Sequence, residues 1–152
     1  MTYKTFASAQ EILDHVAPLL FAQGQRSMLH PCAPDDEEPQ CAYRGEGGLR
    51  CAVGFIIPDE LYNPNIEGSS AISEDLKGIL GKIITTPFGN TYSGLGRFLA
   101  DFQDVHDGWI CDGIDGKDAR TNLIEDLLSL ASRYDLDETV LHSLADQHRK
   151  GA

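Results

Sequence analysis

The sequence predicts a mainly helical α+β domain in which about five helices pack around one small antiparallel β-hairpin. Two patterns lead to this fold class. Apolar residues recur at helical spacing in five separate stretches, and a cluster of glycines at 45–48 separates two runs that are rich in aromatic and β-branched residues. The chain has 152 residues, of which 41% are hydrophobic. This length suits one core, so residues 1–152 are expected to form a single domain.

The first predicted helix covers residues 9–23. Ser8 and Glu11 form a capping-box pattern ahead of apolar residues at helical spacing, and Gly24 is a suitable stop. Pro18 lies inside the helix and is expected to kink it.

Four more helices follow from the same reasoning. Their predicted starts are Ser73, Ser93, Asp118 and Asp137. The helix after Ser93 carries His106 on its apolar face, so this imidazole is expected to point into the core.

The predicted hairpin pairs residues 40–44 with residues 49–57 around the glycine turn. Two registers are compatible with the sequence. If Arg44 pairs with Leu49, Cys41 and Cys51 lie on opposite faces; if Arg44 pairs with Gly48, the two cysteines stand directly opposite each other. Only the second register would allow a disulfide or a shared metal ion.

Residues 26–39 are expected to form a flexible, exposed loop, because this stretch contains three prolines and an acidic run. It carries His30 and Cys32, which together with Cys41 and Cys51 are the candidate metal ligands. Their spacing fits no standard zinc site, and no C-x-x-C pair is present. We therefore expect free thiols, no metal and no cofactor.

Charge is the strongest feature of the composition. The chain has 24 Asp and Glu against 12 Lys and Arg, a net charge of −12. Such a chain repels phosphates, so direct binding to nucleic acid or to an anionic membrane is not expected. No apolar run approaches the roughly 20 residues of a membrane span, and the N-terminus lacks a leader pattern. We expect a cytoplasmic protein. Its negative charge would serve to bind a basic protein partner, to bind a cation, or simply to keep the protein soluble.

Familiar signatures of nucleotide, dinucleotide, calcium and serine-hydrolase sites fail on spacing. The remaining candidate catalytic groups are Cys41 or Cys51 as a nucleophile, with His106 as its base. His106 and Asp107 are neighbours on a helix, and their side chains are not expected to bond readily. His106 is expected either to bond a backbone carbonyl or the hairpin, or to close a ligand pocket. The candidate pocket residues are Tyr43, Arg44, Asp59, Tyr62 and His106.

The middle of the chain resembles a known family. The motif C-x-Y-R-G followed by G-x-x-C-A-x-G-x-x-I-P-D-E-x-Y spans Cys41 to Tyr62, and Glu67-Gly68 and Gln103-x-x-His106-Asp107 follow it. Together these pieces are similar to small uncharacterised proteins encoded by bacteriophages and prophages. The likeness covers residues 41–107. It implies expression in a bacterial host as an accessory gene product, and it assigns no activity to Cys41, Cys51 or His106.

The leading hypothesis is a non-enzymatic binding protein that modulates or antagonises a bacterial host defence system. It would act either through an acidic face that imitates DNA toward a basic host protein, or through a pocket at Tyr43, Arg44 and His106 that captures a small anionic ligand. One alternative is a cysteine and histidine hydrolase; another is a structural or assembly protein. The oligomeric state stays open.

Overall fold

The structure is a computed structural model, and it describes residues 3–28, 42–67, 74–86, 94–109 and 117–151. These ranges contain five α-helices and short 3₁₀ turns, which confirms the prediction of a mainly helical chain. The helices are α1 Ala9–Gln23, α2 Glu74–Ile83, α3 Gly94–Asp107, α4 Ala119–Arg133 and α5 Thr139–Gly151.

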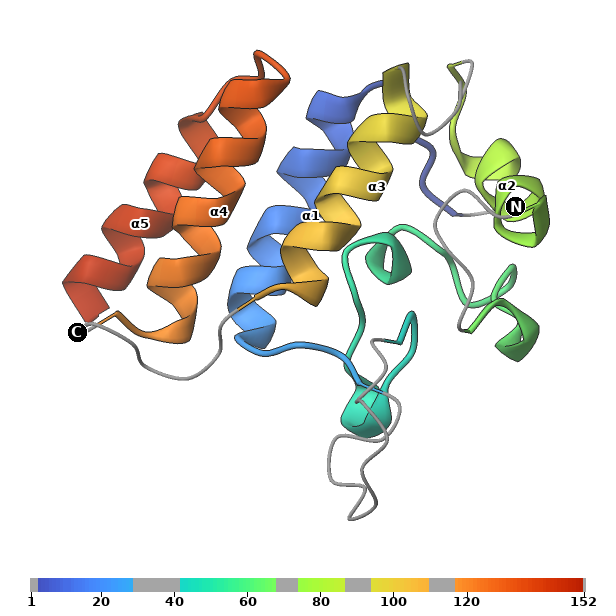
Figure 1. The fold of residues 1–152 in the computed structure, drawn as a ribbon, viewed down its shortest axis with the longest axis horizontal. Coiled ribbons are helices and arrows are strands. Elements are labelled where there is room, and N and C mark those ends of the chain that lie inside the picture. Colours follow the sequence, from blue (N-terminus) through green and yellow to red (C-terminus); the bar gives the residue numbers. More distant parts are fainter. Residues whose placement is uncertain (1–2, 29–41, 68–73, 87–93, 110–116, 152) are drawn as a thin grey trace.

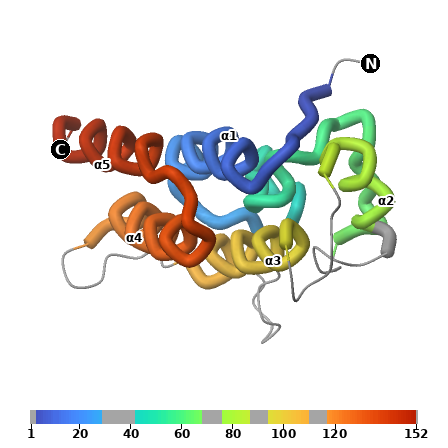
Figure 2. The backbone as a smooth tube through the Cα atoms, turned by 90° about the horizontal axis from the view of Figure 1, so that it is seen from above, coloured from blue at the N-terminus to red at the C-terminus, as the bar shows by residue number. Residues whose placement is uncertain are grey.

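Four of the helices form two layers (Figures 1 and 2). α1 and α5 lie side by side in one layer, and α3 and α4 lie side by side in the other. α2 stands apart, at the end of the bundle beyond α3, next to the irregular segment 42–67. The 3₁₀ turn Val53–Phe55 of that segment packs against α3.

The ends of α1 follow from local chemistry and match the predicted bounds. The hydroxyl of Ser8 accepts a hydrogen bond from the backbone N–H of Glu11 at 3.2 Å. The Glu11 carboxylate accepts in turn from the N–H of Ala7 at 2.6 Å. Gly24 ends the helix with a φ of 72°, a conformation that glycine adopts without strain. Pro18 lies inside the helix, as predicted.

Two later helices begin at the predicted carboxylates. Asp118 accepts from the N–H of Thr121 at 2.9 Å, and Asp137 accepts from the N–H of Thr139 at 2.7 Å. Each carboxylate satisfies an amide that the first turn of a helix leaves unpaired. The caps predicted at Ser73 and Ser93 lie outside the described residues.

α2 is joined to the bundle through the start of the chain. Phe6 and Ile84 form a parallel bridge, in which the N–H of Phe6 donates to the carbonyl of Ile83 at 2.7 Å and its carbonyl accepts from Thr85 at 2.9 Å. The Phe6 side chain is buried in the core. These backbone bonds, the buried Phe6 ring and hydrogen bonds from the hydroxyls of Thr85 and Thr86 to the carbonyls of Phe6 and Ala7 join the C-terminal end of α2 to the start of the chain.

The core lies between the layers and extends beneath segment 42–67. His106 is fully buried, as its place on the apolar face of α3 predicted, and Trp109 is buried just after the helix. The largest of the fully buried apolar side chains are Trp109, Phe6, Phe98, Phe102, Ile12, Leu13, Leu20, Ile57, Ile66, Leu76, Leu80 and Ile83.

The predicted β-hairpin is not seen in residues 42–67. Instead of a strand, this segment contains one isolated antiparallel bridge, between Arg44 and Arg50, and the short 3₁₀ turns. In the apolar run that suggested a strand, consecutive side chains are buried, whereas a strand at a surface would bury every second one. Residues 51–54, 56 and 57 are all buried. β-Branched side chains favour burial in a strand, but they fit a buried irregular segment as well.

The bridge also differs from both predicted registers. Pairing of Arg44 with Arg50 places Tyr43, and not Cys41, opposite Cys51. Cys41 itself lies outside the described residues.

Gly54 is predicted to be intolerant of any side chain. A Cβ atom there would lie 2.2 Å from the carbonyl oxygen of Tyr43. Because that oxygen belongs to the backbone, Gly54→Ala should destabilise the protein by about 2 kcal/mol or more in chemical denaturation.

Gly78→Ala is the matched control for this substitution. A Cβ at Gly78, inside α2, would have no atom within 4 Å. This variant should gain about 0.5–1 kcal/mol, because alanine is the better helix former. Equal stability of the two variants would contradict the close approach of Gly54 to Tyr43.

Candidate functional site

Glu67 holds the beginning of segment 42–67 in place. Its Oε1 accepts from the backbone N–H of Tyr43 at 2.8 Å, and its Oε2 accepts from the N–H of Arg44 at 3.0 Å and from the Tyr62 hydroxyl at 2.6 Å. Burial and the bond to Glu67 raise the pKa of Tyr62 to about 12, so the phenol stays protonated and keeps donating. The Glu67 carboxylate thus supplies the hydrogen-bond acceptors that a neighbouring β-strand would otherwise provide to these backbone amides.

Arg44, the proposed anion-binding residue, is engaged within the protein. Its guanidinium donates to the Asp59 carboxylate and, at 2.7 Å, to the carbonyl of Ile57, and it lies 4.8 Å from the centre of the Tyr62 ring. Arg50 reaches the same Asp59 oxygen at 3.3 Å. The hydrogen bond from Arg44 and the charges of both arginines lower the pKa of Asp59. Three of the predicted pocket residues, Arg44, Asp59 and Tyr62, therefore lie together, but they contact one another.

Gln103, His106 and Asp107 form a second network at the end of α3. The Gln103 carboxamide accepts from the N–H of Val53 at 3.2 Å and donates to the Asp107 carboxylate at 2.8 Å. The same Asp107 oxygen lies 2.9 Å from His106 Nδ1. The expectation that His106 and Asp107 would not bond is therefore wrong: Gln103, one turn earlier, draws the carboxylate back along the helix and within reach of the imidazole.

Ser27 completes a chain of three residues with His106 and Asp107. His106 Nε2 accepts from the backbone N–H of Ser27 at 2.9 Å. Ser27 and Met28 are buried, so the predicted exposed loop does not include them. The order Ser, His, Asp resembles a catalytic triad, but Nε2 is occupied by an amide, and the Ser27 and His106 side chains are both 0% exposed. The arrangement holds the structure together and offers a substrate no access.

Cys51 is placed as a core residue. It is 1% exposed, and its Sγ accepts from the N–H of Gly54 at 3.3 Å. Burial strongly raises the pKa of its thiol. A buried neutral thiol is a poor nucleophile, so the geometry gives no support to Cys51 as a catalyst.

The other candidate metal ligands, His30, Cys32 and Cys41, lie outside the described residues. Within the ranges that the structure describes, no three His, Cys, Asp or Glu side chains are grouped as a metal site.

Thiol labelling is expected to leave Cys51 unmodified. In the native protein at about pH 8.5, where free cysteines react readily, Cys51 should be labelled only as fast as the chain unfolds, because its sulfur is buried. Peptide mass spectrometry after a labelling time course distinguishes the four cysteines. Rapid labelling of Cys51 in folded protein would return it to the list of possible nucleophiles.

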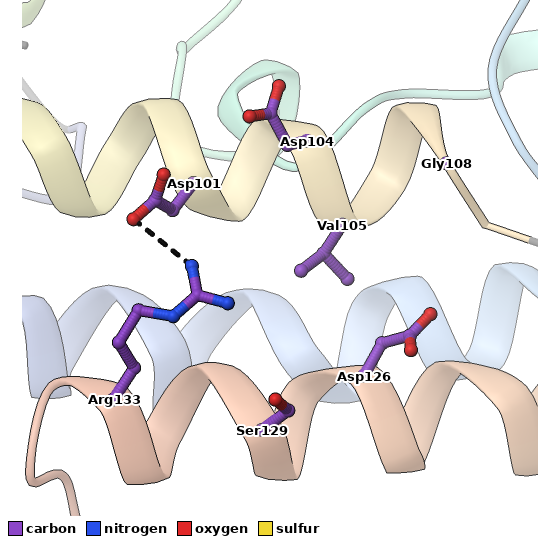
Figure 3. A pocket seen from close by; sticks show the side chains of 7 residues that line it. All are labelled: Asp101, Asp104, Val105, Gly108, Asp126, Ser129 and Arg133. Atoms are coloured by element: carbon purple, nitrogen blue, oxygen red, sulfur yellow. Dashed lines mark ion pairs between the residues drawn. The ribbon is translucent and has the colours of Figure 1, made fainter.

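A groove of about 370 Å³ lies between α3 and α4 (Figure 3). At one end, Asp101 is neutralised: it pairs with Arg133 at 3.3 Å, lies 3.9 Å from Arg97 and accepts from the Tyr134 hydroxyl. The groove is lined by Asp101, Asp104, Val105, Gly108, Asp126, Ser129 and Arg133.

Asp104 and Asp126 give the groove its charge. Neither carboxylate has an ion-pair partner among the described residues, in contrast to Asp101. Partial burial, followed by the charges of Asp107 and Asp101, raises the pKa of Asp104; partial burial and Glu125 raise that of Asp126. Asp104 also lies near the C-terminus of α3, where the helix dipole disfavours an anion. The groove therefore carries negative charge that the protein does not compensate.

A second hollow, of about 340 Å³, lies where the C-terminal ends of α1 and α5 meet the start of α4. Its basic side chains are already used: Arg120 donates to the carbonyls of Phe21 at 2.8 Å and Ala22 at 3.1 Å, and His148 pairs with Asp118 at 2.7 Å. It is a weaker candidate than the α3–α4 groove.

Comparison with known proteins adds no relative: the chain matches no protein-family model, no curated protein and no solved structure. The resemblance to phage and prophage proteins therefore stays a prediction. None of the helices in the described ranges combines the length and apolar content that a membrane span requires.

Removal of the Asp104 charge is expected to stabilise the fold at neutral pH. Folding raises the pKa of Asp104. The stability that its protonated form contributes is therefore fully present below the pKa that Asp104 has in the unfolded chain, and it is lost as the pH rises through the pKa of the folded protein. Asp104→Asn should therefore raise the melting temperature at pH 7 by on the order of 1 °C, because the site is only partly buried, and leave it unchanged at about pH 3.

Glu60→Gln serves as the control for Asp104→Asn, since Glu60 is an exposed carboxylate in a different part of the chain. A lower melting temperature of Asp104→Asn at pH 7 would mean that a favourable partner of Asp104 exists.

Proposed function

We propose that this chain is a non-enzymatic binding protein of phage or prophage origin that acts in the bacterial cytoplasm. In this proposal it modulates or antagonises a host defence protein, and it does so by accepting a basic segment of that protein in the α3–α4 groove.

The unpaired carboxylates of Asp104 and Asp126 support this function most directly. They stand on the two helices that line the groove; in Figure 3 the Val105 side chain points into the space between α3 and α4, whereas the Asp104 carboxylate points away from α4. A lysine or arginine fits such a site, because its aliphatic stem can lie on Val105 while its charged group reaches the Asp126 carboxylate at the rim. Partial burial is the main cause of the raised pKa of both groups; a bound cation would offset the smaller contribution, which is repulsion from Asp107 and Asp101 at Asp104 and from Glu125 at Asp126.

The overall charge supports the same partner class. A net charge of −12 attracts basic surfaces over distances of about a Debye length and speeds their encounter with the protein. A host protein that normally binds nucleic acid would carry such a surface. The groove supplies the local contacts, and the net charge supplies the attraction at longer range.

The other version of the binding hypothesis, capture of a small anion near Arg44, has less support. An incoming anion would have to displace the Arg44 contacts with Asp59, the Ile57 carbonyl and the Tyr62 ring. His106 faces Ser27 and Asp107 instead of a cavity.

The structural or assembly alternative would need an apolar contact surface. In the ranges that the structure describes, Leu19 is the one large hydrophobic side chain that is exposed, at 37%. A single residue of this kind is normal for a monomer surface.

Binding to a peptide rich in lysine and arginine tests the proposal. We expect the double variant Asp104→Asn with Asp126→Asn to bind on the order of fivefold more weakly than the natural chain, with each exposed pair contributing a modest amount. Affinity should also fall steeply with added salt. Isothermal titration calorimetry at two salt concentrations measures both effects.

The matched control is Glu46→Gln with Glu60→Gln. It removes the same amount of charge from two exposed positions outside the groove. We expect this control to bind nearly as well as the natural chain. If both double variants lose affinity equally, the attraction is to net charge alone and the groove has no special role.

A further inference from the structure

The α3–α4 groove has an excess of positive charge at one end. Three groups converge there on a single atom, Oδ2 of Asp101: the Arg133 guanidinium at 3.3 Å, the Arg97 guanidinium at 3.9 Å and the Tyr134 hydroxyl. Two positive charges therefore meet one negative charge. The arginine side chains are also the more exposed, at 56% for Arg97 and 55% for Arg133 against 22% for Asp101. A group that binds at this end meets a surface that is positive on balance.

The other end of the groove is negative. Asp126 is exposed, and among the described residues no cation pairs with it. Its sequence neighbour Glu125 is paired with Lys117 at 3.0 Å, so the charges of that pair cancel. The groove thus carries opposite charges at its two ends, although the chain as a whole is strongly acidic.

The separation of the two ends is set by one helix. Figure 3 shows Arg133 and Asp126 at opposite ends of the groove, both on α4, with Ser129 between them. An α-helix rises about 1.5 Å per residue, so the Cα atoms of Asp126 and Arg133 lie about 10 Å apart along the axis. A partner must therefore present two opposite charges at about this distance.

An extended chain suits the groove better than a helix does. With its side chains an α-helix is about 10–12 Å across, so about 10 Å of its length occupies on the order of 900 Å³. The groove offers about 370 Å³. In the polyproline II conformation, which unfolded segments commonly adopt, side chains three residues apart point to the same side and lie about 9 Å from each other. Positions i and i+3 of such a segment match the two ends of the groove.

A segment with both charges also suits the groove better than a wholly basic one. A lysine or arginine beside Arg133 meets a like charge, whereas an aspartate or glutamate there gains a hydrogen bond. Arg133 can make this bond without leaving Asp101, because a guanidinium has five N–H donors and the contact with Asp101 engages its Nη1 group. A free α-amino acid is too short, because its ammonium and carboxylate groups are attached to one carbon atom.

We propose that the α3–α4 groove binds an extended segment of the partner in which a lysine or arginine lies three residues from an aspartate or glutamate. The basic side chain pairs with Asp126, with its aliphatic stem on Val105, and the acidic side chain pairs with Arg133. This inference rests on the function proposed above, and it narrows the basic segment to one with an acidic residue at a fixed distance. Arg133 is then the residue that sets specificity.

Four short peptides of alanine and serine, each with two adjacent arginines, test the proposal. The first has a glutamate three residues beyond the arginine pair, and the second has the reverse order, so that both chain directions are sampled. The third has glutamine in place of the glutamate, and the fourth has the glutamate seven residues from the pair. Titration followed by heteronuclear NMR gives a dissociation constant for each peptide and shows which residues of the protein it contacts.

The sign of the glutamate effect is the decisive result. A glutamate lowers the positive charge of the peptide, so attraction to the net charge of −12 alone predicts weaker binding. The groove predicts the opposite: the first or the second peptide should bind on the order of threefold more tightly than the glutamine peptide, the gain typical of one exposed ion pair. The fourth peptide should bind more weakly than the glutamine peptide, because its opposite charges are about 22 Å apart when it is extended.

Two variants of equal net charge assign the effect to Arg133. Arg133→Gln should abolish the preference for glutamate, and it should fold because Arg97 and Tyr134 still hold Asp101. Arg149→Gln removes the same charge from α5, where the side chain is 74% exposed and lies outside the groove, and it should keep the preference.

Three results would overturn the inference. They are binding of both i+3 glutamate peptides no tighter than that of the glutamine peptide, an unchanged preference in Arg133→Gln, and tightest binding of the fourth peptide, whose spacing fits a helix. In each case the proposed function stands if the glutamine peptide contacts the groove and Asp126→Asn weakens its binding. If no peptide contacts the α3–α4 residues, the proposed function fails together with the inference.

Discussion

The structure depends on one constraint: the buried backbone of residues 42–67 must be hydrogen bonded without a regular helix or strand to do it. Side chains supply several of these bonds. Glu67 accepts the amides of Tyr43 and Arg44, and the Gln23 carboxamide binds both the N–H and the carbonyl of Arg50, at 2.9 and 2.8 Å. Gln103 accepts from Val53. Because these partners come from α1 and α3 as well as from the segment itself, satisfying its backbone also fixes how those helices meet.

This constraint gives a physical meaning to the motif pieces that the sequence carries between Cys41 and Asp107. Glycine at 54 allows contact with the Tyr43 carbonyl, Arg44 bonds the Ile57 carbonyl, and the Gln103-x-x-His106-Asp107 group bonds the amides of Val53 and Ser27. Each of these residues contributes a contact or a hydrogen bond to the fold, and the His106 imidazole among them is fully buried. Residue types that suggest a reaction centre in the sequence therefore stabilise an irregular segment in the structure.

Features that depend on residues close in sequence could be predicted, and those that depend on distant neighbours could not. The caps at Ser8 and Asp118, the stop at Gly24 and the inward side of His106 follow from a few consecutive residues. The bond from Ser27 to His106 joins residues 79 positions apart. The groove exists because α3 and α4 are neighbours in the fold, and no local sequence pattern predicts that contact. Of the predicted hairpin, the described residues show one antiparallel bridge and no strand, because an apolar β-branched run indicates burial more reliably than it indicates a strand.

α3 serves two purposes on two faces. Gln103 and His106 face the segment that they support, whereas Asp104 lines the groove and accepts no hydrogen bond from a backbone amide among the described residues. Mutation can therefore alter the charge and shape of the groove at little cost in stability. Under the function proposed above, such a helix would let the binding surface change with its target while the domain that carries it stays the same.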